Sequence, residues 1–208
     1  MKIFNNIMNI EYEATFLNIN KDEIRKKLKA SRAKLIKPEF LQKRFAFDLP
    51  KGHENGNAWL RVRDEQDKIT MSYKEINGKN IEDQKEINLI IDNFDAGKEL
   101  LKTIGCRMKS YQETKRELWE LDGVEICIDE WPFLEPFVEI EGKSEKEVKE
   151  ASEKIGFDYY KALFCGVTAI YSMKYNISVE AIEIINNQTP KIVFDMENPF
   201  LKFKIFKK

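Results

Sequence analysis

Two stretches of this chain, NIEYEATF (residues 9–16) and FVEIEG (residues 137–142), decide its fold. Both alternate apolar and polar side chains, a pattern that is typical of a β-strand. Alternate residues of a strand point to the same side, so the pairs Glu11/Glu13 and Glu139/Glu141 each place two carboxylates about 6–7 Å apart on one face. Charges on strands normally face water, and here they come in matched pairs.

A third stretch, WLRVRD (residues 59–64), repeats this spacing with the opposite sign, since Arg61 and Arg63 are also two residues apart. Carboxylate oxygens are preferred ligands of hard divalent cations, and arginines bind phosphate groups bidentately. A barrel with these residues on its inner face would therefore bind a metal and a polyanion.

Length and charge favour one domain with no general affinity for polyanions or membranes. The chain has 208 residues, of which 42% are hydrophobic, and no long linker, so residues 1–208 are predicted to form a single domain. The formal net charge of −1 gives no overall attraction to nucleic acid or to an anionic membrane. The sequence therefore predicts neither of these partners.

The spacing of the cysteines and the lack of recognisable targeting signals predict a cytoplasmic location. The three cysteines are odd in number and widely spaced, which argues against both disulfides and a zinc site. The N-terminal stretch has no continuous apolar run with a cleavage site, and no apolar segment of about 18 residues occurs. Secretion and membrane spanning are not expected.

Strands followed directly by helices recur three times. Asn20 with Glu23, and Ser144 with Glu147, form capping-box patterns that predict helices after the two carboxylate-bearing strands. A third strand, residues 86–94, precedes a helix that Gly105 ends. Further strands joined by hairpin-sized turns are expected at residues 41–49, 58–65, 68–76, 111–121 and 124–131. The sheet should be largely antiparallel.

The phase of these strands separates an apolar face from a polar one. In VEICID, for example, Val124, Ile126 and Ile128 alternate with polar residues. A sheet with one wet face would show the same alternation. However, helices that follow the strands must cover the apolar face, which leaves the polar face either to solvent or to the inside of a closed barrel.

The last third of the chain is less regular. A helix is plausible over residues 157–173, and residues 178–196 are expected to add strand at a sheet edge. An exposed edge of this kind would suit a homodimer.

Taken in order, these motifs resemble the CYTH family, also called triphosphate tunnel metalloenzymes. The family includes thiamine triphosphatases, inorganic triphosphatases and class IV adenylate cyclases. The resemblance rests on EYEAT, WLRVRD, TMSYK, QETKRELWELDGVEICIDE and FVEIEG. It implies an α+β fold, a closed eight-stranded antiparallel β-barrel with helices packed outside. The barrel domain would span about residues 9–175, with a C-terminal extension over about 176–208.

The resemblance also implies roles for ten side chains inside the tunnel. Arg61 and Arg63 would bind the triphosphate bidentately, with Lys74 and Arg116 adding charge along it. One or two Mg²⁺ or Mn²⁺ ions would be held by Glu11, Glu13, Glu139 and Glu141. Glu11 and Glu13 would be catalytic through activation of water, and Glu86 and Asp129 would complete the acidic side.

Two threonines depart from the family pattern. Thr15 stands where the signature Glu-x-Glu-x-Lys has lysine, and Thr114 stands where a second basic residue is common. Both changes remove positive charge, so triphosphate affinity would fall unless Lys85, Lys109 or Lys115 compensates from a neighbouring position.

Hydrolysis of a triphosphate is the activity that the sequence favours. Phosphoryl transfer needs positioning and charge neutralisation more than a covalent nucleophile, and no Ser–His–Asp or Cys–His set can be built around the single histidine. The substrate would be inorganic triphosphate, a nucleoside triphosphate or thiamine triphosphate. The alternatives are a class IV type adenylate cyclase and a non-catalytic phosphate-binding module, the latter favoured by Thr15.

Overall fold

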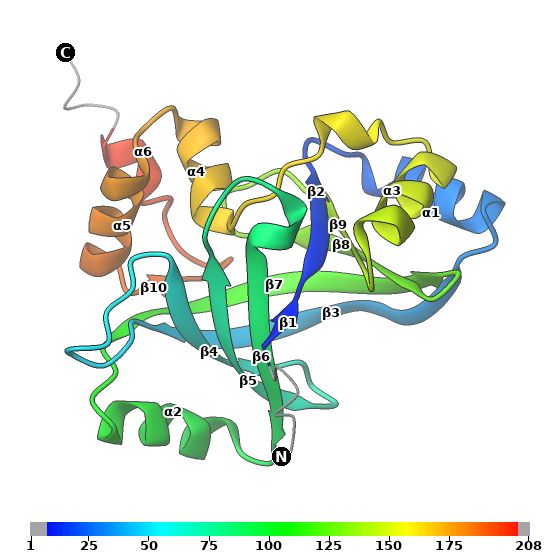
Figure 1. Cartoon of the computed structure of the whole chain (residues 1–208). Helices are drawn as coiled ribbons and strands as arrows, with labels where there is room; N and C mark the ends of the chain where they lie inside the picture. Colours follow the sequence, from blue (N-terminus) through cyan, green and yellow to red (C-terminus); the bar gives the residue numbers. More distant parts are fainter. Residues whose placement is uncertain (1–7, 204–208) are drawn as a thin grey trace, which may run out of the picture.

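The computed structural model describes residues 8–203, and its centre is an antiparallel β-barrel (Figure 1). The strands are β1 (Asn9–Ile10), β2 (Tyr12–Phe16), β3 (Lys34–Phe47), β4 (Ala58–Asp64), β5 (Ile69–Ile76), β6 (Gln84–Ile91), β7 (Met108–Leu121), β8 (Val124–Glu130) and β9 (Phe137–Gly142). Their order is β1-β6-β5-β4-β3-β7-β8-β9-β2. The prediction about the N-terminal leader rests largely on residues 1–7, which lie outside the described range.

The N-terminal segment closes the barrel. Glu11 alone separates β1 from β2, and β1 pairs with β6 while β2 pairs with β9. The backbone N–H of Glu11 donates to the carbonyl of Gln84, 2.9 Å away, and so continues the pairing with β6. Counted as one interrupted strand, β1 and β2 give the eight-stranded barrel that the sequence predicted, and the α+β fold class is confirmed.

Alternation along the strands sorts side chains between the inside and outside of the barrel. On β8, Val124, Ile126 and Ile128 belong to an apolar cluster outside, whereas Cys127 and Asp129 are buried on the other face. The β7–β8 hairpin turns at Asp122 and Gly123, which both have positive φ, as the tight turns favoured in hairpins require. The polar faces therefore line the barrel interior.

Three helices cover the outside of the barrel, each directly after a strand as predicted. They are α1 (Lys21–Ala30), α2 (Phe94–Thr103) and α3 (Glu145–Lys154). The side chains of Asn20 and Ser144 accept hydrogen bonds from backbone N–H groups in the first turns of α1 and α3. These caps satisfy donors that a helix start leaves unpaired.

Two apolar clusters hold these helices on the sheet. Residues of α1 and α3, including Leu28 and Val148, pack with Ile126 and Ile140 of the barrel wall. Leu101 of α2 packs on Val62 of β4. A side chain at Gly97 would lie 2.5 Å from the side chain of Ile91, so this glycine allows the close approach of α2 to the sheet.

The C-terminal part differs from the sequence-based expectation. Residues 157–166 do not form an α-helix, because Asp158 caps a short 3₁₀ turn (Tyr159–Lys161) and Leu163 pairs with Thr15 in an isolated bridge. Helix α4 begins only at Val167 and ends at Tyr175. The strand expected over residues 178–196 is confined to the two-residue β10 (Lys191–Ile192), which pairs parallel with β7, because most of the segment forms α5 (Val179–Gln188). The prediction of a homodimer rested on an exposed strand edge in this segment, and the structure does not provide that edge.

The C-terminal helices α4, α5 and α6 (Phe200–Phe203) share a third apolar cluster with the turn after β8. Phe200 is fully buried and stacks on Tyr171, with ring centroids 4.5 Å apart. The hydroxyl of Tyr171 donates to the carbonyl of Pro132, 2.7 Å away, and that of Tyr175 donates to the carbonyl of Phe133, 2.8 Å away. Helix α4 therefore fixes the turn that connects β8 to β9.

None of the helices within residues 8–203 has the length and apolar character needed to cross a membrane.

Candidate functional site

Carboxylates from β9 and the N-terminal segment gather on one wall of the barrel. The β2–β9 register places Glu13 opposite Glu141 and Thr15 opposite Glu139. Glu11 lies in the break between β1 and β2, and only 7% of its surface is exposed. The alternation of both strands, recognised from the sequence, thus turns these acidic side chains inward.

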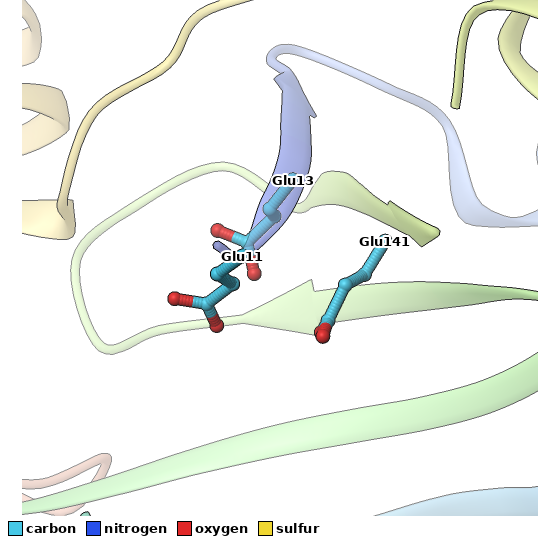
Figure 2. A group of neighbouring side chains, drawn as sticks. All are labelled: Glu11, Glu13 and Glu141. Atoms are coloured by element: carbon cyan, nitrogen blue, oxygen red, sulfur yellow. The ribbon is translucent and has the colours of Figure 1, made fainter. Parts of the chain in front are cut away.

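Three of these carboxylates converge (Figure 2). One oxygen from each of Glu11, Glu13 and Glu141 lies within 4.8 Å of the others. Burial and the neighbouring charge of Glu11 raise the pKa of Glu13 to about 8 and that of Glu141 to about 7. Buried carboxylates that repel one another are stabilised by a cation between them, and oxygen donors suit Mg²⁺ or Mn²⁺. The donor set therefore fits the hard divalent ion expected from the sequence.

Glu139 lies apart from this trio. Its carboxylate accepts a hydrogen bond from Arg116 Nη2, 2.6 Å away. Burial and the carboxylates of Glu13 and Asp129 raise the pKa of Glu139 well above its ordinary value. The structure thus brings together three of the four proposed metal ligands and pairs the fourth with a base.

Of the proposed phosphate-binding residues, Arg61 and Arg63 are buried and Lys74 and Arg116 are partly buried, and each contacts a carboxylate. Lys74 Nζ lies 2.6 Å from Glu11, and Arg61 Nη2 lies 3.1 Å from Glu86. Arg63 lies 2.7 Å from Glu65, an acidic residue that the sequence analysis did not include.

Arg116 binds Asp129 through two nitrogens, at 2.8 and 2.5 Å. Burial opposes the charge on Asp129, but the guanidinium of Arg116 outweighs it and lowers the pKa of Asp129. The ten residues named from the sequence thus form the carboxylate trio and several ion pairs, in which Glu86 and Asp129 are partners of the bases.

Arg44 is a further interior base that the sequence analysis missed. It is 5% exposed and donates hydrogen bonds to Gln42 and Thr114. The alternation in LQKRFAF could have identified Arg44 as an inward-facing residue. Phe45 and Phe47 pack outside the barrel, so Gln42 and Arg44, at the alternate positions, point inward.

The lysines proposed to compensate for the two threonines do not reach the interior. Lys109 lies 3.3 Å from Asp48, and Lys115 lies 3.5 Å from Glu130 and over the ring of Phe194. Lys85 alternates with the interior residue Glu86. Odd-numbered positions of β7 face outward, as Trp119 and Leu121 in the outer apolar cluster do, so Lys109 and Lys115 point away from the interior bases.

Comparison with known proteins agrees with this architecture. Similar solved structures include a protein from Pyrococcus horikoshii OT3, with 22% identity, a TM-score of 0.60, and coverage of 73% of this chain and 93% of that chain. A putative adenylate cyclase from Vibrio parahaemolyticus has 12% identity and a TM-score of 0.67, over 79% of this chain and 98% of that chain.

A third structure, a putative adenylyl cyclase from Hippeastrum with a dominant triphosphatase activity, has 15% identity and a TM-score of 0.54, over 81% of this chain and 97% of that chain. Identities this low show the fold. No curated protein matches the chain significantly. The CYTH domain, in contrast, matches residues 9–168. That match spans every strand of the barrel and the helices packed around it, so the chain belongs to the CYTH family.

Proposed function

We propose that this protein hydrolyses a triphosphate, with a divalent cation, inside the barrel. The proposal rests on two sets of opposite charge that share the barrel interior. One is the carboxylate trio of Glu11, Glu13 and Glu141, and the other is the bases Arg61, Arg63, Lys74 and Arg116. Phosphoryl transfer requires charge neutralisation around the phosphate oxygens, and fixed charges act strongly where water is excluded.

The ion pairs of the interior would exchange partners when substrate binds. Lys74 and Arg61 now contact Glu11 and Glu86. A phosphate would accept two parallel hydrogen bonds from Arg61 and a charge-assisted hydrogen bond from Lys74, and a cation held by Glu11, Glu13 and Glu141 would replace the positive charge that Lys74 now gives Glu11. When bound, such a cation supplies positive charge to phosphoryl oxygens and lowers the pKa of water.

The other interior acids would position the bases. Asp129 holds Arg116 through two hydrogen bonds, and Glu139 accepts a third from the same guanidinium. A guanidinium fixed in this way presents its remaining donors in one direction, which lowers the entropic cost of binding a phosphate.

Phosphate release is the direct test. Inorganic triphosphate, ATP and thiamine triphosphate are each incubated with the full chain and Mg²⁺ or Mn²⁺, alongside Glu13→Gln and Arg61→Gln. Each variant is expected to lose roughly 100- to 1,000-fold in rate. Glu150→Gln is the matched control, because Glu150 lies on the outer surface of α3 with 66% of its side chain exposed.

Two outcomes would redirect the assignment. Cyclic AMP and pyrophosphate formed from ATP would identify a cyclase instead. Tight triphosphate binding with no product would identify a binding module, the alternative that the missing basic residues at Thr15 and Thr114 favour. Equal activity of wild type and Glu13→Gln would contradict the role of the carboxylate trio.

A further inference from the structure

Five buried polar atoms of the barrel interior have no hydrogen-bond partner within the part of the chain that the structure describes. They are Gln42 Nε2, Arg44 Nε, Arg61 Nε, Thr70 Oγ1 and Trp131 Nε1. All five can donate a hydrogen bond. Because buried donors in native proteins are almost always paired, these five donors are available to a ligand rich in acceptor oxygens.

These donors line the wall opposite the carboxylates. Arg44 of β3 pairs across the sheet with Arg63 of β4, and Arg63 pairs with Thr70 of β5. In the closed order of strands, β3 lies four places from β2 in either direction. Trp131 follows β8 and reaches the same region, since its ring lies 4.5 Å from the Arg44 guanidinium carbon.

Arg44 is the interior base that forms no ion pair among the described residues, although Asp129 acts on its charge from a distance. Its hydrogen bonds go to two neutral oxygens, Gln42 Oε1 at 2.8 Å and Thr114 Oγ1 at 2.5 Å. Burial, and after it the charges of Arg63, Arg61 and Arg116, hold the pKa of Arg44 well below its ordinary value. A buried guanidinium is costly without a close counter-ion, so an anion bound here would stabilise Arg44.

The position of Arg44 also accounts for the charge missing at Thr114. The Arg44 guanidinium donates a hydrogen bond to the Thr114 hydroxyl. Arg44 of β3 therefore places a positive charge beside position 114, where β7 itself has none. The backbone that follows Trp131 is restrained by α4, because the hydroxyls of Tyr171 and Tyr175 donate hydrogen bonds to the carbonyls of Pro132 and Phe133. The position of Trp131 is thus fixed before any ligand binds.

We propose that Arg44, with Gln42, Thr70 and Trp131, forms a phosphate-binding subsite on the basic wall of the barrel. The ligand is a tetrahedral phosphate oxyanion, supplied either as the terminal phosphoryl group of a triphosphate or as free orthophosphate. This subsite rests on the proposed function, since it orients a phosphate chain that extends toward the carboxylate trio. It makes Arg44 a substrate-binding residue that replaces the basic residue absent at position 114.

Binding without turnover tests the subsite. The full chain, labelled with ¹⁵N at its tryptophan indoles and kept free of divalent cations by a chelator, is titrated with inorganic triphosphate, pyrophosphate and orthophosphate. The Trp131 N–H resonance, identified by its loss in Trp131→Phe, is expected to shift. A shift with orthophosphate alone indicates a site for the free ion, whereas a shift that requires triphosphate indicates a site for the terminal phosphoryl group.

Variants of Arg44 separate binding from a structural role. Arg44→Gln should weaken triphosphate binding roughly 10- to 100-fold, as expected for loss of charge-assisted hydrogen bonds, and Arg44→Lys should restore part of it. Arg44→Gln should also melt no lower than wild type without ligand, because it removes an uncompensated buried charge. Arg107→Gln, which removes the same charge from a side chain that is 62% exposed, should bind as wild type does.

The subsite and the proposed function can fail separately. An unmoved Trp131 resonance, or triphosphate affinity of Arg44→Gln within twofold of wild type, would overturn the subsite even if phosphate is released in the presence of metal. A Trp131 shift that depends on Arg44, in a protein that releases no phosphate with any metal, would retain the subsite and reject hydrolysis.

Discussion

Glu13 lies half-buried beside Glu11 and Glu141, and the loss of hydration inside the barrel, followed by the charge of Glu11, raises its pKa from 4.5 to about 8. The folded protein therefore holds a proton on Glu13 that the unfolded chain releases near pH 4.5. Stability from this group is complete below pH 4.5 and is lost as the pH rises through about 8. The metal-free protein should thus melt at a lower temperature at pH 9 than at pH 6.

Glu13→Gln separates this effect from general alkaline destabilisation. Glutamine stays neutral at every pH, so the variant should lose less of its melting temperature between pH 6 and 9 than wild type does. Thermal melts in a chelator, at both pH values, measure the difference. Parallel curves for the two proteins would show that Glu13 does not retain its proton.

Metal affinity should rise with pH for the same reason. A cation at the trio competes with protons on Glu13 and Glu141, whose pKa values are about 8 and about 7. Binding of Mn²⁺ should tighten from pH 6 to pH 8.5 and release protons. Calorimetry in two buffers of different ionisation enthalpy counts those protons, and an affinity that does not change with pH would contradict the site.

The sequence predicted which side chains face inward, but not which of them meet. Strand alternation places Glu139 and Glu141 on one face, yet Glu141 joins Glu13 whereas Glu139 joins Arg116. That choice depends on rotamers and on side chains from other strands. Arg44 was predictable in principle, because the same alternation that locates Arg61 applies to β3.

Helix α4 links the extension to the barrel through the turn after β8. Tyr171 is 4% exposed, and its hydroxyl donates to the carbonyl of Pro132. Tyr171→Phe leaves that carbonyl unpaired and should cost about 1 kcal/mol of stability. Urea denaturation measures the loss, and Tyr160→Phe is the control, since Tyr160 is 82% exposed. Equal stability of the two variants would show that the bond contributes nothing.

The elements that the sequence predicted well have local signals. Caps at Asn20 and Ser144 and the stop at Gly105 depend on a few neighbouring residues, and each lies where expected. A strand was predicted over residues 178–196 because a sequence rich in isoleucine favours strands. The helical signal was the spacing of the buried Ile182 and Ile185 after the cap at Ser178, three residues apart on one face.

The molecule as a whole should unfold in one step, because the extension and the barrel share one apolar cluster. Phe200 of α6 is fully buried and belongs with Trp131 and Phe137 of the barrel to that cluster. Phe200→Ala should therefore destabilise the entire protein by about 3–5 kcal/mol.

Its neighbour provides the control. Leu201 is 53% exposed, so Leu201→Ala should change stability little. Guanidinium denaturation followed by both far-UV circular dichroism and tryptophan fluorescence tests the coupling. Two separated transitions in Phe200→Ala, with the barrel transition unmoved, would show that the extension folds independently.

The interruption of the N-terminal strand at Glu11 would determine where a triphosphate enters the barrel. Only two residue pairs, Asn9 with Glu86 and Ile10 with Lys85, join β1 to β6, with support from the bonds between Gln84 and the backbone of Glu11 and Glu13. This joint is the shortest in the ring and adjoins the carboxylate trio. A brief lateral opening there would admit a phosphate chain from the side, and a cation bound to the trio would then hold the joint shut. Amide hydrogen exchange at Glu11 should accordingly slow when Mn²⁺ is added, while exchange in the long β3–β7 pairing stays the same.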